Sequence, residues 1–184
     1  MAQPVPRELV EAARSGDSGE IELLLKAVWP DACRLSYAVL GDWQAAQDAA
    51  QESCVIVYRT ISSLRDPAAF RAWFYRIVVR EASSLRSRRI ESPFENEPAR
   101  ELEDPTASLD VWRSLATLPA HLREVVVLYY FEDLTSREVA SVLGIHDGAV
   151  RFRLMTARRQ LRALLGDVFD EKTACNNEVT TNAI

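Results

Sequence analysis

Apolar side chains recur at intervals of three and four residues along most of the chain, which is the spacing of amphipathic helices. One clear stripe lies beneath a basic face and consists of Phe70, Trp73, Phe74, Ile77 and Val78. β-Branched runs are short and fall within the same helical spacing. The pattern therefore predicts an all-α protein.

Glycine, proline and capping residues divide this pattern into successive helices. Gly41 is suited to end one helix and Asp42 to begin the next, and Pro30 predicts a break or kink in the helix before them. Asp66 and Pro67 are typical of the first residues of a helix. We expect helices at about 7–15, 18–40, 42–64, 67–90, 108–118, 119–131, 135–143 and 148–165.

The helical spacing fails from about Glu91 to Thr106, where the chain is acidic and rich in proline. We interpret this segment as a linker, with an irregular loop inside a single domain as the alternative. The prediction is two small helical domains, 1–90 and 107–166, joined by an acidic, proline-containing linker, 91–106. Residues 167–184 lose the apolar spacing and are expected to form a flexible tail.

The positive charge is unevenly distributed, although the formal net charge of the chain is −5. Arginines crowd residues 65–89 and again residues 151–162, whereas acidic residues gather in the linker. This asymmetry indicates two anion-binding surfaces on an acidic body. For either cluster alone, a solvated helix face is the alternative.

The segment after the linker has the pattern of a helix-turn-helix motif. Thr135 and Glu138 form a capping-box signature at the start of a short helix, Gly144 ends it, and a longer basic helix follows a tight turn. In such a motif the second helix enters the major groove of DNA. The residues that we assign to DNA contact are His146, Ala149, Arg151, Phe152, Arg153, Met155, Thr156, Arg158 and Arg159.

Residue spacing in the second helix separates an inward from an outward face. The inward face consists of Val150, Leu154, Ala157 and Leu161. At about 100° per residue, Phe152 and Arg159 point away from that face. A large aromatic side chain there contributes little to folding and is suited to pack on a thymine methyl group, with a neutral surface aromatic as the alternative.

The sequence gives little support for catalysis, a metal or a cofactor. The motifs of phosphate-binding loops, dinucleotide-binding folds and nucleophile elbows are absent, and we predict no catalytic residue. His121 and His146 have no ligand partner at a useful spacing. Cys33, Cys54 and Cys175 lie far apart, which is typical of a reducing cytoplasm, and a redox role for Cys33 or Cys54 stays open.

A membrane location is not indicated. The first twenty residues lack the apolar segment of a secretory signal, and no run of about 18 apolar residues occurs. We therefore expect a cytoplasmic protein without membrane insertion.

Two segments of the chain resemble the extracytoplasmic-function (ECF) group of bacterial sigma factors. Their region four is similar to residues 115–165, LATLPAHLREVVVLYYFEDLTSREVASVLGIHDGAVRFRLMTARRQLRALL. Their region two is similar to residues 40–89, LGDWQAAQDAAQESCVIVYRTISSLRDPAAFRAWFYRIVVREASSLRSRR. Both occur in the order of the family, joined by a linker of the expected kind.

The resemblance implies that the chain directs core RNA polymerase to promoters. Region two would bind the clamp-helix coiled coil of the largest polymerase subunit and read the promoter element nearest the start site. Region four would bind the flap of the second-largest subunit and read the upstream element with the helix-turn-helix residues assigned above. An anti-sigma factor that covers the polymerase-binding surfaces is an expected partner, and neither region performs covalent chemistry.

The resemblance also assigns residues of region two. Polar side chains of the helix after Asp42 would contact polymerase, the loop before Pro67 would capture a base, and arginines of the following helix would track DNA. The first set is Gln47, Asp48, Gln51 and Glu52, the second is Ser62, Ser63, Arg65 and Asp66, and the third is Arg71, Arg76, Arg80 and Arg86. We expect Trp73 and Phe74 to belong to the core.

Several positions depart from the family pattern. Arg80 stands where asparagine is common, Cys54 where an aromatic residue is common, and Gln47 where glutamate is common. On the outward face of the last helix, Phe152 replaces a usual serine and Thr156 a usual arginine. The upstream element is therefore expected to differ from that of typical relatives.

Two other functions compete with this interpretation. A self-sufficient helix-turn-helix regulator would bind DNA without polymerase, but it would not need the polymerase-binding segment within residues 40–89. A protein-binding adaptor would use the second domain for docking and would be indifferent to reversal of the charges on Arg151 and Arg159.

Overall fold

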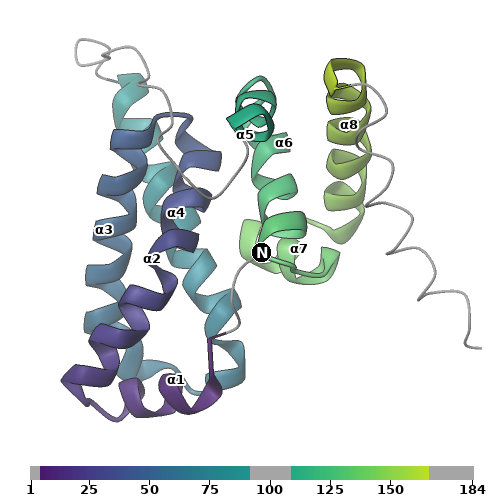
Figure 1. Ribbon diagram of the computed structural model, residues 1–184. Coiled ribbons are helices and arrows are strands. Elements are labelled where there is room, and N and C mark those ends of the chain that lie inside the picture. The colour runs from purple at the N-terminus through teal and green to yellow at the C-terminus, as the bar shows by residue number, and fades with distance from the viewer. Residues whose placement is uncertain (1–4, 92–108, 166–184) are drawn as a thin grey trace, which may run out of the picture.

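The computed structural model of the protein describes residues 5–91 and 109–165, and every regular element in these ranges is a helix (Figure 1). We refer to the two ranges as the N-terminal half and the C-terminal half. The predicted all-α class is confirmed. The predicted tail and all of the predicted linker except Glu91 fall outside the described residues.

The N-terminal half is a bundle of three long helices closed at one end by a short one (Figure 1). The long helices α2, α3 and α4 pack side by side, while α1 lies against α2 and the turns that precede α4. The elements are α1 (Arg7–Arg14), α2 (Ser18–Leu40), α3 (Trp43–Thr60), the 3₁₀ turns η1 (Ile61–Ser63) and η2 (Pro67–Ala69), and α4 (Phe70–Glu91).

Capping residues fix the boundary between α2 and α3, as the sequence predicts. Gly41 ends α2 with φ of +72°, a left-handed conformation that glycine adopts without steric cost. The Asp42 carboxylate then accepts a hydrogen bond of 2.7 Å from the amide of Ala45 at the start of α3. At Pro30, where the sequence predicts a break or kink, α2 is not broken: it continues through the proline with Val28 and Ala32 buried on either side. Packing of the flanking turns outweighs the hydrogen bond lost at proline.

The C-terminal half contains the helix-turn-helix. Its elements are α5 (Leu109–Ala116), α6 (Ala120–Val126), the π-helical turn η4 (Val127–Phe131), α7 (Ser136–Leu143) and α8 (Asp147–Leu165). The Thr135–Glu138 capping box is present, and Gly144 ends α7 with φ of +65°. The predicted helix over 119–131 is divided between α6 and η4. At its end, the amide of Glu132 donates to the carbonyl of Val127, five residues back (3.1 Å).

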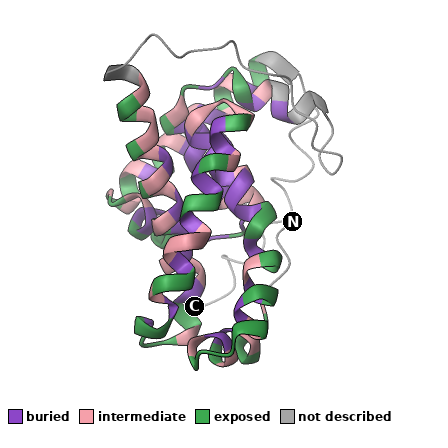
Figure 2. Cartoon of the chain, turned by 90° about the vertical axis from the view of Figure 1, so that its left-hand side faces the viewer, coloured by how far each residue is buried: buried purple, intermediate pink, exposed green. Residues whose placement is uncertain are grey.

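The two halves share one continuous apolar core. Trp112 of α5 is buried and packs edge-on against Tyr37 of α2, with ring centroids 5.8 Å apart, and against Phe131 at 5.2 Å. Figure 2 shows buried positions concentrated between the helices and exposed positions along their outer sides. The described residues thus form one packed body, with α2, α4, α6 and α7 at the contact between the halves.

Candidate nucleic-acid and polymerase interfaces

Helix α8 separates an inward apolar face from an outward face, as predicted. Val150, Leu154, Ala157 and Leu161 are all buried. On the opposite side, the side chains of Phe152 and Met155 are 64% and 59% exposed. Two large apolar side chains one helical turn apart therefore stand in water on the second helix of the helix-turn-helix.

Several polar side chains of α8 are held by internal contacts. Arg151 pairs with Asp147 one turn earlier (2.7 Å), and the Arg158 Nε donates to the Tyr130 hydroxyl (2.6 Å). The Thr156 hydroxyl donates to the backbone carbonyl of Phe152 (2.9 Å). These contacts leave an apolar centre on the outward face, flanked by arginines.

The remaining residues assigned to this surface lie on α8 or directly before it. His146 and Arg159 are exposed, and Ala149 and Arg153 are half-buried. The backbone carbonyl of His146 accepts from the amide of Ala149 (2.9 Å), which places the imidazole at the entry to α8. All nine assigned residues thus lie within the first thirteen residues of α8 or immediately before it.

A second outward surface lies on α3, at the outer edge of the bundle (Figure 1). Asp48, Gln51 and Glu52 are exposed, and Gln47 is half-buried beside them. The same side of the helix continues to Tyr58, which is 58% exposed and which the sequence analysis did not single out. Tyr58 follows Gln51 by seven residues, or about two helical turns, and this spacing alone predicts that the two side chains share one side of α3.

The loop between α3 and α4 is exposed but anchored. Ser62, Ser63, Arg65 and Asp66 all face solvent, whereas Ile61 and Leu64 are buried beneath them. The Asp66 carboxylate caps η2 by accepting from the Ala68 amide (2.9 Å). From α1, the guanidinium of Arg14 donates to the backbone carbonyls of Leu64 (3.3 Å) and Arg65 (3.0 Å).

This tether predicts that Arg14→Ala loosens the loop. Loss of the two hydrogen bonds from one guanidinium nitrogen, together worth about 1 kcal/mol, should speed local amide exchange at Leu64 and Ala69 about fivefold. Hydrogen exchange followed by NMR measures this rate. Arg7→Ala is the matched control, since Arg7 is also on α1 but pairs with Glu11. Equal exchange rates in the two variants would contradict the tether.

The arginines assigned to α4 divide into two groups. Arg76 and Arg80 are exposed on the outer side of the helix. Arg71 and Arg86 instead meet the C-terminal half: Arg71 donates to the backbone carbonyl of Glu132, and the Arg86 Nη1 lies 3.2 Å from the Glu124 carboxylate. Next to them, Phe74 is buried as expected, and Trp73 is half-buried against Phe70.

Comparison with known protein families shows what these surfaces belong to. Residues 24–90 match the family model "Sigma-70 region 2", and residues 108–161 match "Sigma-70, region 4". The RNA polymerase sigma-H factor of Pseudomonas aeruginosa is 28% identical over 93% of this chain and 99% of its own length. The ECF RNA polymerase sigma factor SigM of Mycobacterium tuberculosis is 29% identical over 86% of this chain and 84% of its own.

The chain belongs to the ECF group of RNA polymerase sigma factors.

Other relatives agree with this assignment. A probable RNA polymerase sigma factor, RfaY of Xanthomonas campestris, is 33% identical over 74% of this sigma factor, which spans 38% of that relative's length. The solved structure of CnrH in complex with the cytosolic domain of CnrY covers 86% of the chain at a TM-score of 0.64 and 25% identity. The sigma factor RpoE in complex with the anti-sigma factor NepR, from Bartonella quintana, has a TM-score of 0.67 at 22% identity and shares the fold over 78% of the chain.

The sequence left a redox role open for Cys54, and burial of its thiol argues against that role in this sigma factor. Desolvation raises the pKa of the Cys54 thiol to about 11, so it stays protonated at neutral pH and is a poor nucleophile. Within residues 5–91 and 109–165, no cluster of three or more potential metal ligands occurs. None of the helices described there is long and apolar enough to cross a membrane.

Proposed function

We propose that this sigma factor directs core RNA polymerase to specific promoters and assists their opening, using three separate surfaces. The observation that carries this proposal is that region two and region four match in family order, and that each presents exposed members of its assigned residues, on α3 and on α8. The chain acts in the cytoplasm and contributes no covalent chemistry.

The α3 surface is proposed to bind the clamp-helix coiled coil of the largest polymerase subunit. Asp48 and Glu52 lie one turn apart and both face solvent, so they present negative charge to a basic partner. Gln47 and Gln51 add hydrogen-bonding groups beside them. Region four is proposed to contact the flap of the second-largest subunit.

The downstream promoter element is assigned to the loop and α4. Ser62 and Ser63 offer hydroxyl groups to an unstacked base, with Arg65 and Asp66 beside them, on a loop that buried anchors hold in place. Tyr58 stands one turn before this loop and offers a ring on which a base can stack. Arg76 and Arg80 are exposed and suited to phosphate contact, and Arg71 and Arg86 join them when the C-terminal half moves away.

The upstream element is assigned to α8 and His146. Because Phe152 and Met155 form the centre of the outward face, we propose that this centre reads thymine methyl groups in the major groove. The arginines around it would hold the DNA backbone.

This assignment predicts sensitivity to single methyl groups. Replacing a contacted thymine with deoxyuridine removes only the C5 methyl, and should weaken use of the upstream element about fourfold, since burying one such group is worth about 0.8 kcal/mol. Run-off transcription on substituted templates measures the effect. Phe152→Ala should be insensitive to the same substitution. If wild type and variant lose the same activity, Phe152 does not read the methyl group.

An anti-sigma factor is a proposed partner. The solved structures described above contain RpoE with the anti-sigma factor NepR and CnrH with a domain of CnrY. A partner of this kind would cover the α3 surface and prevent polymerase binding.

Run-off transcription with purified core polymerase tests the proposed function. Transcripts with discrete starts should appear only when the chain is added to polymerase and genomic fragments. Promoter-specific binding of duplex DNA by the chain alone, with no polymerase binding, would instead support a self-sufficient helix-turn-helix regulator.

A further inference from the structure

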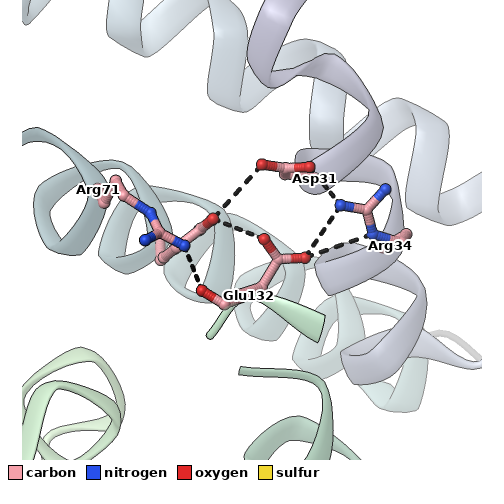
Figure 3. Close-up of polar contacts among 5 residues, drawn as sticks. Asp31, Arg34, Arg71 and Glu132 are labelled. Atoms are coloured by element: carbon pink, nitrogen blue, oxygen red, sulfur yellow. Dashed lines mark hydrogen bonds and ion pairs between the residues drawn. The ribbon is translucent and has the colours of Figure 1, made fainter. Parts of the chain in front are cut away.

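Glu132 is a fully buried acidic residue that joins the two halves of the molecule. It follows the π-helical turn η4, and its side chain is 0% exposed. The carboxylate points out of the C-terminal half and lies between α2 and α4 of the N-terminal half (Figure 3). A buried carboxylate is costly unless charged or polar groups surround it.

The N-terminal half supplies those groups from two helices (Figure 3). From α2, the Arg34 guanidinium donates to Glu132 Oε1 at 3.3–3.4 Å and also pairs with Asp31. From α4, the Tyr75 hydroxyl donates to Glu132 Oε2 at 2.6 Å, and Arg71 donates to the Glu132 backbone carbonyl. Both the side chain and the backbone of Glu132 are therefore held by the other half.

A second polar contact closes the far end of the same interface. Arg123 of α6 is buried, and its Nε donates to the backbone carbonyl of Ala38 in the last turn of α2 (2.6 Å). A positive charge is favoured there by the helix dipole. Nearby, Arg86 of α4 pairs with Glu124 of α6 at 3.2 Å.

We propose that Glu132 holds this sigma factor in a closed form that masks Arg71 and Arg86, and that the C-terminal half must leave α4 before these arginines reach DNA. One guanidinium cannot hold Glu132 or Glu124 and a phosphate in the same place. The inference rests on the proposed function, because masking matters only if Arg71 and Arg86 bind DNA.

The masking is selective. Asp48 and Glu52 on α3, and Phe152 and Met155 on α8, are exposed in the closed form. Polymerase can therefore meet α3 while the guanidinium groups of Arg71 and Arg86 are still bound to the C-terminal half. The closed form therefore controls binding of the downstream promoter DNA and does not control the first contact with polymerase.

The geometry also gives the closed form a pH dependence. Glu132 faces Asp31 and Arg34 from α2, and Arg71 and Tyr75 from α4. Burial, followed by the nearby Asp31 carboxylate, raises the pKa of Glu132 from 4.5 to about 7. Its proton is thus bound more tightly in the closed form than in the open one. Closure is favoured at low pH and loses that advantage as pH rises from about 4.5 through about 7.

Two variants of the full-length chain test whether Glu132 holds the closed form. Glu132→Ala removes the carboxylate and should open the molecule, seen as a larger radius of gyration in small-angle scattering. Unmasked arginines should also tighten binding of a fluorescein-labelled oligo-dT about tenfold, since the apparent dissociation constant scales inversely with the open fraction. Adding Arg71→Ala to Glu132→Ala should reverse most of that gain. Glu22→Gln, an exposed carboxylate on α2, is the matched control and should change neither reading.

Glu132→Gln tests the role of Glu132 in the closed form without creating a cavity. The amide keeps the shape of the side chain and one acceptor oxygen for Arg34, its NH2 group can donate to the Tyr75 hydroxyl oxygen, and it does not titrate. This variant should stay compact from about pH 5 to about pH 8, whereas the wild type expands over the same range.

The outcomes separate the closed form from the proposed function. An unchanged radius of gyration in folded Glu132→Ala would overturn the role of Glu132 in holding the closed form. Equal pH profiles for wild type and Glu132→Gln would overturn the pH dependence assigned to Glu132. An expanded Glu132→Ala chain that binds oligo-dT no better than wild type would overturn the masking. Run-off transcription by the wild type is a separate experiment. If no promoter-specific transcript appears, the proposed function is wrong, and small-angle scattering still decides whether Glu132 holds the two halves together.

Discussion

Phe74→Ala should lower the free energy of unfolding by about 3–5 kcal/mol, the usual cost of removing a buried phenyl ring. Phe74 is 1% exposed and lies at the centre of the N-terminal half, stacked on Phe70 (centroids 5.8 Å apart) and tilted against Tyr75 (5.4 Å). Neighbouring rings on a rigid helix cannot collapse fully into the cavity. Urea denaturation followed by circular dichroism measures the loss.

Phe152→Ala provides the matched control, since it deletes the same ring from a position that is 64% exposed. Its unfolding free energy should stay within about 0.5 kcal/mol of wild type. Similar losses in both variants would mean that Phe152 packs in the folded core, and would remove the main support for its role in reading DNA.

Reversing the charge of both Asp48 and Glu52 to arginine should weaken binding to core polymerase about 100-fold. The two carboxylates face solvent one turn apart on α3, so the change replaces attraction to a basic coiled coil with repulsion. Folding should be unaffected because neither side chain packs in the core. Fluorescence anisotropy with labelled chain and purified core enzyme measures the affinity.

The control for this experiment is Glu22→Arg, a charge reversal at an exposed position of α2 that pairs with Lys26 in the next turn. It should alter polymerase affinity by less than about threefold, in line with the small energies of exposed pairs. If the control weakens binding as much as the α3 variant, net charge rather than the α3 surface governs association.

Periodicity and local capping predict much of this fold from the sequence. The inward face of α8, the capping box at Thr135 and the stop at Gly144 depend on neighbours within one or two turns, so the local pattern contains the information. The outward side chains of α8 and α3 follow from the same periodicity. Pro30 shows the limit of this reasoning. The local rule predicts a break or kink there, but burial of Val28 and Ala32 on either side keeps α2 continuous.

Long-range pairing could not be predicted in the same way. Glu132 and Arg34 are 98 residues apart, and an acidic residue beside Asp133 looks like an ordinary surface position in the sequence. Arg71 and Arg86 likewise belong by composition to the basic face of α4, yet their partners are in the other half of the molecule. Only packing of the two halves brings these groups together.

The contact between Arg123 and the end of α2 has a consequence for synthesis on the ribosome. The carbonyl of Ala38 and the guanidinium of Arg123 are 85 residues apart, so α2 emerges and folds well before its partner has been translated. Until then, the Ala38 carbonyl lacks the hydrogen bond from Arg123. The nascent N-terminal bundle therefore leaves the tunnel with Arg34, Arg71 and Tyr75 unpaired by Glu132, and docking of the two halves is a late step of folding.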